Sequence, residues 1–307
     1  MKRLAVVGSG FAGLSVVWHA LQKGYEVTLF DPAGIGAGAS GVSTGLLHPF
    51  PGKTASLSWK ARDGMEATRA LLLVAKSALS CPVASYTGIF RPAITESQKQ
   101  SFRQNKEALW KEVSLPGMPP TEGLWIEEGI TVFSRLYLKG LWLASEKMGA
   151  VFIQEKFSQP HLFDRIVFAM GSETTTLEEC KHLPVRTAIG QSLVCEWDHP
   201  LPFSLASQGY ITLTEDPSLC QVGSTYEHTL EPDPKKALAL IHQVSYFYPP
   251  ALHFKIKEIR SGKRVAPKEG HQPIIAQISP KAWVFTGLGS RGLLYHAFLG
   301  AHLAALL

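Results

Sequence analysis

Cysteine is scarce in this chain of 307 residues, and the four that occur follow no metal-binding spacing. Cys81, Cys180, Cys195 and Cys220 form no C-x-x-C pair, so the sequence predicts neither a disulfide framework nor a metal site. Reduced thiols are typical of a cytoplasmic protein, which is the location we expect. Low-complexity tracts, internal repeats and runs of like charge are also missing, which excludes a disordered or repeat protein.

Long hydrophobic runs are lacking as well. The uncharged stretch over 292–307 contains two histidines and is shorter than the roughly 20 residues of a membrane-spanning helix. The apolar stretch that ends near Leu21 is better explained by its glycine pattern than as a signal peptide. We therefore expect no membrane span. A hydrophobic content of 45% and a net charge of +5, with scattered basic residues, predict one large or two modest folded domains.

What the chain does have is a glycine-rich turn between a predicted strand, 3–7, and a helix predicted at about 12–22. Gly8, Gly10 and Gly13 match the G-x-G-x-x-G pattern of dinucleotide sites. In that pattern they permit a tight turn, a close approach of backbone to pyrophosphate, and close packing of helix on strand. The free N–H groups at the start of the helix, around Phe11 and Ala12, would face the phosphates.

The second predicted strand, 25–30, delivers Asp31 to the same site. An acidic residue at this position binds a ribose hydroxyl and disfavours a 2′-phosphate. The pattern therefore favours FAD or NAD over NADP.

Further helices and strands are predicted along the rest of the chain, and 34–52, rich in Gly, Ala and Ser, is predicted to be an ordered loop or lid. The class expected is α/β, with a Rossmann-like nucleotide-binding domain on a parallel sheet and a second, α+β domain on an antiparallel sheet. Segments 1–80, 131–185 and 263–307 are assigned to the first domain, and 81–130 and 186–262 to the second, substrate-binding domain. Helices are predicted at 62–79, 95–113, 136–148, 234–248 and 293–307, and strands at 130–133, 150–153, 164–171, 191–197, 210–214, 219–225 and 282–286.

Several other motifs follow in an order that resembles the D-amino acid oxidase and glycine oxidase family of flavoenzymes. They span nearly the whole chain and lie at 38–41, 45–47, 167–171, 185–191, 209–211, 222–226, 262–264 and 286–292. The last is most similar to the C-terminal oxidase domain of the bifunctional enzyme that modifies wobble uridine in tRNA. The resemblance implies FAD as the cofactor, bound by a GR2-type Rossmann-like domain.

The resemblance also implies which residues hold the flavin. Ser40 would hydrogen-bond the pyrophosphate and ring, while leucines after Gly45 pack on the flavin. Backbone amides at the start of the last helix would stabilise negative charge on the reduced flavin. For the segment around Ser40 the alternative is a surface loop. For the start of the last helix it is a tight turn without a ligand. The full set expected to bind the cofactor is Gly8, Gly10, Phe11, Ala12, Gly13, Asp31, Ser40, Gly45, Leu46, Leu47, Gly171, Gly287, Gly289, Ser290, Arg291, Gly292 and Leu293.

Three residues are expected to serve the reaction. The family places an arginine at the position of Arg264, where its planar fork grips a substrate carboxylate; a structural ion pair is the alternative. Tyr210 would face the substrate or pack across strands. His48 would carry protons, attach the flavin covalently, or be structural. The sequence departs from the family after the arginine, because 267–270 and 273–276 replace its usual acidic residue and Pro-x-x-Gly.

These features predict an FAD-dependent oxidoreductase that oxidises the C–N bond of a small amino acid or N-substituted glycine. Hydride passes to the flavin and the imine is hydrolysed, so neither paired carboxylates nor a Cys/His couple is required. The expected partner is a small carboxylate-bearing amine. Removal of a carboxymethyl group from modified tRNA uridine, and a flavin-binding protein without amine oxidase activity, remain alternatives. No oligomeric state is predicted.

Overall fold

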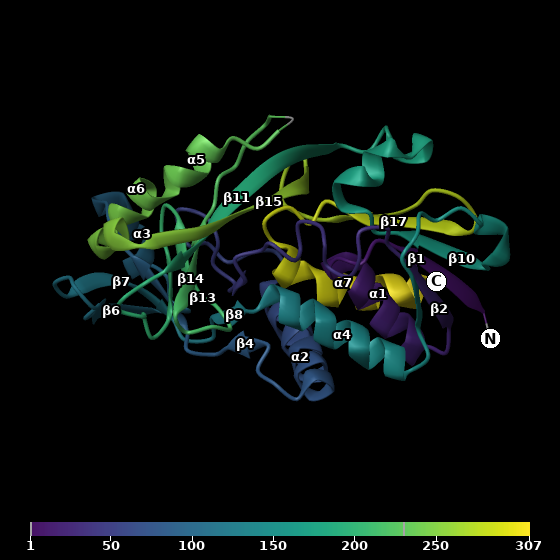
Figure 1. Cartoon of the computed structure of the whole chain (residues 1–307), viewed down its shortest axis with the longest axis horizontal. Helices are drawn as coiled ribbons and strands as arrows, with labels where there is room; N and C mark the ends of the chain where they lie inside the picture. The colour runs from purple at the N-terminus through teal and green to yellow at the C-terminus, as the bar shows by residue number, and fades with distance from the viewer. Residues whose placement is uncertain (1, 230) are drawn as a thin grey trace.

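Six strands from distant parts of the chain form one sheet in the computed structural model, which describes residues 2–229 and 231–307 (Figure 1). The order is β16-β17-β10-β1-β2-β9, parallel throughout except that β16 pairs antiparallel with β17. The predicted parallel sheet is therefore confirmed. The strands are β1 (Arg3–Val7), β2 (Glu26–Phe30), β9 (Val151–Ile153), β10 (Arg165–Phe168), β16 (Ile274–Gln277) and β17 (Ala282–Thr286).

Side chains of β1 alternate between two cores. Leu4 and Val6 belong to the large cluster beneath the helices, whereas Ala5 and Val7 pack with Phe30 on the opposite face. Because successive side chains of a strand point to opposite faces, this sheet is covered on both sides.

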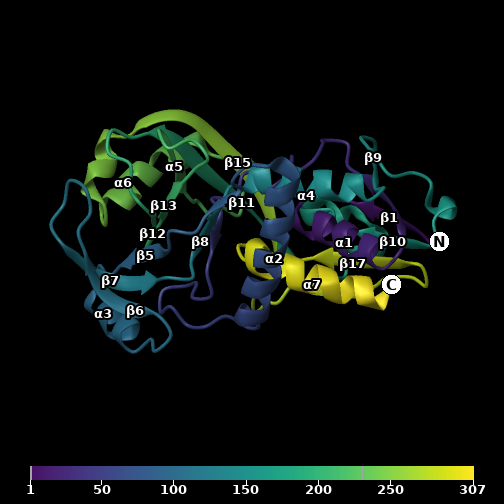
Figure 2. The same ribbon diagram turned by 90° about the horizontal axis from the view of Figure 1, so that it is seen from below.

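Four helices pack together against the first of these faces. They are α1 (Phe11–Gln22), α2 (Ala61–Leu79), α4 (Ser134–Lys147) and α7 (Gly292–Leu306). Helix α1 contacts both α7 and α4, and α2 contacts α4 and α7, as Figure 2 shows. The N-terminal and C-terminal helices thus meet beside the glycine-rich turn. None of the helices within 2–229 and 231–307 is long and apolar enough to cross a membrane.

A second, eight-stranded sheet lies beside the first and is antiparallel except where β12 meets β5. Its order is β15-β11-β14-β13-β12-β5-β7-β6. The long edge pair β15 and β11 runs back toward the parallel sheet (Figure 1). The strands are β5 (Ile89–Pro92), β6 (Leu109–Val113), β7 (Thr121–Ile126), β11 (Val185–Glu196), β12 (Ser204–Ala206), β13 (Tyr210–Leu213), β14 (Leu219–Gly223) and β15 (Lys255–Pro267).

The remaining regular structure is short. It comprises α3 (Glu96–Arg103), α5 (Pro234–Leu238), α6 (Leu240–Ser245), and 3-10 helices at Pro160–Leu162, Gly171–Thr176, Glu178–Cys180 and Pro249–His253. A small sheet joins β3 (Leu46–Leu47), β8 (Ile130–Val132) and β4 (Ala84–Ser85). The α/β class with a second, antiparallel sheet is as predicted, whereas the domain boundaries stay a prediction.

The prediction of an ordered loop or lid over 34–52 is wrong at 46–47, where β3 pairs with β8, while the rest of the segment forms turns and loop. Gly45 precedes this strand with a φ of 80°, and a Cβ at this position would lie 2.0 Å from the carbonyl oxygen of Val132. Only glycine fits such a conformation and such a close approach. The end of this segment is therefore anchored into the fold.

The helix predicted at 95–113 is also wrong in its second half. Helix α3 ends at Arg103, and the Asn105 side chain then accepts hydrogen bonds from the backbone N–H groups of Glu107 and Ala108. An asparagine that satisfies its own turn in this way competes with helix continuation. The chain proceeds as strand β6 instead. The helix predicted at 234–248 is likewise divided, into α5 and α6.

Candidate active site

A cavity of about 410 Å³ lies where the glycine-rich turn, the 39–52 segment, β15 and the start of α7 converge. Most of the residues predicted for the site line it. Gly8, Gly10, Ala12, Gly13, Asp31, Gly45, Leu47 and Gly287 lie outside its lining. The predicted residues within the lining are Phe11, Ser40, Leu46, His48, Gly171, Tyr210, Arg264, Gly289, Ser290, Arg291, Gly292 and Leu293.

The glycine-rich turn is shaped by close backbone contacts. Gly8 has a φ of 107°, and a Cβ there would lie 2.3 Å from the carbonyl oxygen of Ala169 on the neighbouring chain segment. At Gly13 a Cβ would lie only 1.8 Å from the carbonyl oxygen of Gly8. The turn and the first turn of α1 therefore need glycine at both positions.

Asp31 closes β2 and is engaged within this turn. Its carboxylate accepts the backbone N–H of Ser9 at 2.9 Å and the Ser9 hydroxyl at 2.8 Å, while its second oxygen accepts the N–H of Ala33 at 3.0 Å. A carboxylate has further lone pairs to offer. The predicted ribose contact therefore remains compatible with this network, and Ser9, which the sequence did not single out, orients the acid.

Ser40 lies opposite the start of α1. Its Oγ accepts the N–H of Phe11, the first residue of the helix, at 3.0 Å. A Cβ on Gly10 would come within 2.8 Å of the same oxygen, so Gly10 leaves the space in which the serine sits. The hydroxyl hydrogen stays available to donate to an anion at this helix N-terminus.

The N-terminus of α7 forms another wall of the cavity. Gly289, with a φ of 54°, precedes the helix, and Gly292 to Leu294 line the cavity. Below this wall, His296 is fully buried, with its Nε2 2.6 Å from the Tyr137 hydroxyl and its Nδ1 2.9 Å from the Gly292 carbonyl oxygen. Burial lowers the pKa of His296 to about 4, so its imidazole is neutral near pH 7. This buried pair fixes the first turn of α7.

Arg264 projects into the cavity from β15. Its Nη2 donates to the Ser224 hydroxyl at 3.0 Å, and in the described part of the chain it forms no ion pair with a carboxylate. Burial lowers the pKa of this guanidinium, an effect that Tyr210 and Tyr226 oppose. A largely buried charge normally has a charged partner, so the structural ion pair considered from the sequence is not what holds Arg264 here.

A second buried arginine, Arg91, lines an adjoining cavity that Tyr210 also lines. Arg91 on β5 is 4% exposed and donates to the carbonyl oxygens of Phe50 and Gly52, which holds the segment after β3 in place. Burial lowers the pKa of Arg91 to about 10, and Tyr210 opposes that shift as it does for Arg264. Tyr210 lines the cofactor cavity together with Arg264, and it lines an adjoining cavity together with Arg91.

His48 is close to this second arginine. Its Nδ1 is buried without a hydrogen-bond partner, and burial together with the charge of Arg91 lowers its pKa to about 3. The imidazole is neutral near pH 7 and therefore suited to hydrogen bonding rather than to donating a proton. Its predicted roles as proton carrier and flavin attachment point stay predictions.

The charge of the cavity is one-sided. Lys263, Arg264 and Arg291 line it, and its lining contains neither aspartate nor glutamate. Such a site favours an anionic ligand. The glycine turn, the two helix N-termini and this positive lining together fit a dinucleotide pyrophosphate and a carboxylate.

Sequence reasoning missed Arg91, Ser224 and Lys263. A signal for Arg91 was present, because an arginine within the apolar strand over 89–92 is unusual unless its charge is used. Ser224 and Lys263 lie inside motifs quoted for the family resemblance, but neither was chosen as a site residue.

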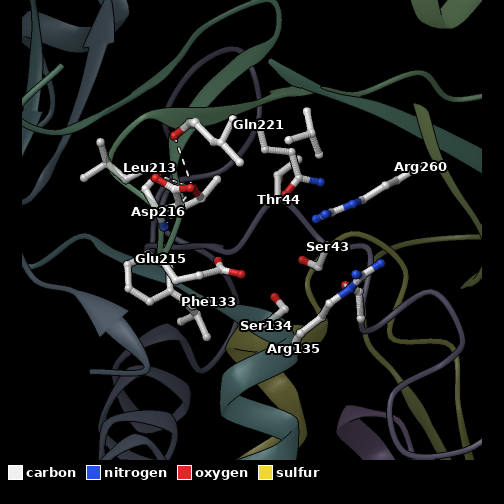
Figure 3. A pocket seen from close by; sticks show the side chains of 15 residues that line it. Ser43, Thr44, Phe133, Ser134, Arg135, Leu213, Glu215, Asp216, Gln221 and Arg260 are labelled. Carbon is white, nitrogen blue, oxygen red and sulfur yellow. Dashed lines mark hydrogen bonds between the residues drawn. The ribbon is translucent and has the colours of Figure 1, made fainter. Parts of the chain in front are cut away.

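A smaller cavity of about 50 Å³ is lined by residues of the 41–44 segment and of β15 (Figure 3). It shares Ser43 and Thr44 with the larger cavity. Arg135 and Arg260 project into it opposite Glu215 (Figure 3). Its mixed charge and small volume distinguish it from the main cavity.

Comparison with known proteins agrees with this geometry. The family model of the DAO family, described as FAD dependent oxidoreductase, matches residues 3–306. The fold is similar to glycine oxidase from Geobacillus kaustophilus, with a TM-score of 0.83 and 18% identity over 99% of this chain and 94% of that chain. It is also similar to iminodiacetate oxidase from Chelativorans sp. BNC1, with a TM-score of 0.80 and 17% identity over 99% and 94% of the two chains.

Curated relatives are longer than this chain. One, the tRNA 5-methylaminomethyl-2-thiouridine biosynthesis bifunctional protein MnmC of Leptospira borgpetersenii, is 24% identical over 99% of this chain and 57% of its own length. The protein of the same name from Maricaulis maris is 46% identical over 46 residues, which are 15% of this chain and 8% of that protein. The chain thus spans little more than half, or less, of the relatives it matches.

The family match covers almost the whole chain, and the glycine turn, the helix N-termini and the positive cavity suit the dinucleotide that this family binds. The chain belongs to the DAO family of FAD-dependent oxidoreductases, and FAD is its cofactor.

Proposed function

We propose that this enzyme oxidises the C–N bond of a small amino acid or an N-substituted glycine. The observation that carries the proposal is Arg264, a largely buried guanidinium in the cofactor cavity that no carboxylate of the described chain neutralises. A substrate carboxylate would supply the missing negative charge and accept two parallel hydrogen bonds from the guanidinium N–H groups. The names of two similar structures, glycine oxidase and iminodiacetate oxidase, support this substrate class.

When bound, FAD supplies a two-electron acceptor for the hydride on the carbon next to nitrogen. The substrate loses that hydride and one proton from nitrogen, and a C=N bond forms. Water then adds to the imine carbon, and the C–N bond breaks to give a carbonyl compound and an amine. Arg264 orients the substrate through its carboxylate, so that the reacting carbon is positioned rather than activated by a side chain.

The other residues of the cavity would hold the cofactor. We assign the pyrophosphate to the N-terminus of α1 with Ser40, and the flavin to the space between Leu46 and the start of α7. The N–H groups from Gly289 onward would stabilise the negative charge of the reduced flavin. The predicted division into an FAD-binding and a substrate-binding domain is retained as part of this proposal.

The test is anaerobic mixing of the holoenzyme with a panel of amines while flavin absorbance is followed. We expect glycine or N-substituted glycines to bleach the flavin band, and amines that lack the carboxylate to leave it unchanged. If dithionite bleaches the flavin but no carboxylate-bearing amine does, the chain is a flavin-binding protein without amine oxidase activity, and the proposal fails.

A second candidate substrate is a carboxymethylamino group carried by tRNA uridine, which is itself an N-substituted glycine. The match to the tRNA-modifying relative over 99% of this chain and the net charge of +5 favour it. This reading predicts tRNA binding that weakens steeply with salt, because phosphate contacts release counterions. Absence of a gel shift with bulk tRNA at low salt would exclude it.

A further inference from the structure

A second cavity, of about 440 Å³, adjoins the cofactor cavity. The two share His48, Pro51, Gly52 and Tyr210, so they meet at Tyr210, with Arg264 lining one cavity and Arg91 the other. This space is as large as the cofactor cavity itself, and nothing in the proposed oxidation of glycine would fill it.

The second cavity has a buried floor and an open rim. Arg91 and Ala206 on its floor are 4% and 3% exposed, whereas Lys53, Thr95 and Ser97 on its rim are exposed. A ligand that enters from the cofactor cavity would therefore pass Tyr210 and extend toward solvent. This shape fits a substituent attached to a substrate better than a separate small molecule.

The chemistry of the lining is positive and hydrogen-bonding. Arg91 and Lys53 are its cations, and the lining contains no aspartate or glutamate. The Nε of Arg91 is buried without a hydrogen-bond partner. Ser97 and Ser101 on α3 line the same space, and the N-terminus of that helix, whose first residue Glu96 is paired with Lys99, adds a partial positive charge. These are the groups that would surround an anion.

Building on the proposed function, we infer that the second cavity holds the substituent on the substrate nitrogen, and that this substituent is anionic. Arg264 would bind the glycine carboxylate on one side of Tyr210. Arg91 and Lys53 would attract the second negative group on the other side. The preferred substrate is therefore an N-substituted glycine with an acidic tail, not glycine alone.

The test compares two substrates of equal size in the holoenzyme. N-(2-carboxyethyl)glycine carries an acidic tail, and N-(2-carbamoylethyl)glycine carries the neutral amide in its place. We expect kcat/KM for flavin reduction to be about tenfold higher for the acid, the scale of one charge-assisted hydrogen bond. Binding provides a second readout: glutarate should perturb the flavin spectrum at lower concentration than its monoamide.

Two variants connect this preference to the second cavity. Lys53→Ala should reduce the acid-to-amide ratio by about two- to fivefold, because an exposed cation contributes modestly. Ser101→Phe should narrow the cavity and lower kcat/KM for both tailed substrates relative to N-methylglycine. The control is Lys106→Ala, which removes an exposed lysine that lines neither cavity and should leave the ratio unchanged.

The outcomes separate this inference from the function on which it rests. Equal or greater turnover of the amide, or a ratio that Lys53→Ala leaves unaltered, overturns the acidic tail while C–N oxidation stands. If no carboxylate-bearing amine reduces the flavin, both fail together, whatever the binding of glutarate.

Discussion

Replacing Arg264 with alanine is expected to lower kcat/KM for carboxylate substrates by about a hundredfold or more while FAD stays bound. The guanidinium is largely buried and its hydrogen-bond partner is the Ser224 hydroxyl, so a substrate carboxylate in the variant would be buried without its counter-charge. Steady-state kinetics with N-methylglycine, together with the flavin-to-protein absorbance ratio, would measure both parts of the expectation.

Two matched variants define what the arginine contributes. Arg264→Lys keeps the charge but loses the planar fork, so its loss should be smaller yet still evident. Arg260 lies on the same strand, is paired with Glu258 and does not line the cofactor cavity. Arg260→Ala should therefore leave KM near its original value. Unchanged turnover of every carboxylate substrate by Arg264→Ala would refute the assignment of Arg264 to the substrate carboxylate.

The Arg264 guanidinium can also be displaced without removing it. A Cβ on Gly190, on the neighbouring strand β11, would lie 2.3 Å from Nη2 of Arg264. The atoms it meets belong to the end of a flexible side chain, so in Gly190→Ala the guanidinium should move while the sheet stays folded. We expect a raised KM with little change in melting temperature. This result would distinguish a displaced Arg264 guanidinium from a damaged fold.

Local patterns made one part of this site predictable. The β1 turn, α1 and Asp31 are adjacent in sequence, and Gly13 is required by a backbone contact within the turn itself, whereas Gly8 meets Ala169 beyond the neighbouring strand β10. The same holds at the start of α7, where Gly289 precedes the helix with a positive φ. Short-range geometry of this kind leaves a direct mark on the sequence.

No local sequence pattern shows that Arg91 and Arg264 contribute to the same site. The two residues come from β5 and β15, which are separated by four strands and five strand pairings in the eight-stranded sheet, and they approach one site only through Tyr210 and the segment after β3. Strand order depends on long-range pairing, which no periodicity within β5 reveals. Asn105 illustrates the opposite error, since a local side-chain hydrogen bond ended a helix that the longer pattern favoured.

Replacing Gly13 with alanine is expected to weaken FAD binding by about ten- to a hundredfold, the scale of overpacking against backbone atoms. The added Cβ would lie 1.8 Å from the carbonyl oxygen and 2.9 Å from the carbonyl carbon of Gly8, and both are backbone atoms. The start of α1 must then move away from the glycine turn, which misplaces the N–H groups assigned to the pyrophosphate. Titration of the apoprotein with FAD would measure the loss.

Gly38→Ala is the matched control. Gly38 lies in the separate segment 34–52, which is also rich in glycine; it has no positive φ, and a Cβ there meets no atom within 4 Å. Its FAD affinity should remain within about twofold of the original, as for a surface substitution that makes no new contact.

The sign of the Gly13→Ala effect discriminates between two roles for this glycine. Gly13 lies inside α1, where alanine is favoured over glycine by about 1 kcal/mol of helix propensity. If the residue served only the helix, the substitution would raise the melting temperature of the apoprotein and leave FAD affinity intact. If it lets the helix approach the turn closely, FAD affinity must fall even when circular dichroism shows the helices preserved. We expect the second result, because no side chain can yield to the new methyl group at the Gly8 carbonyl.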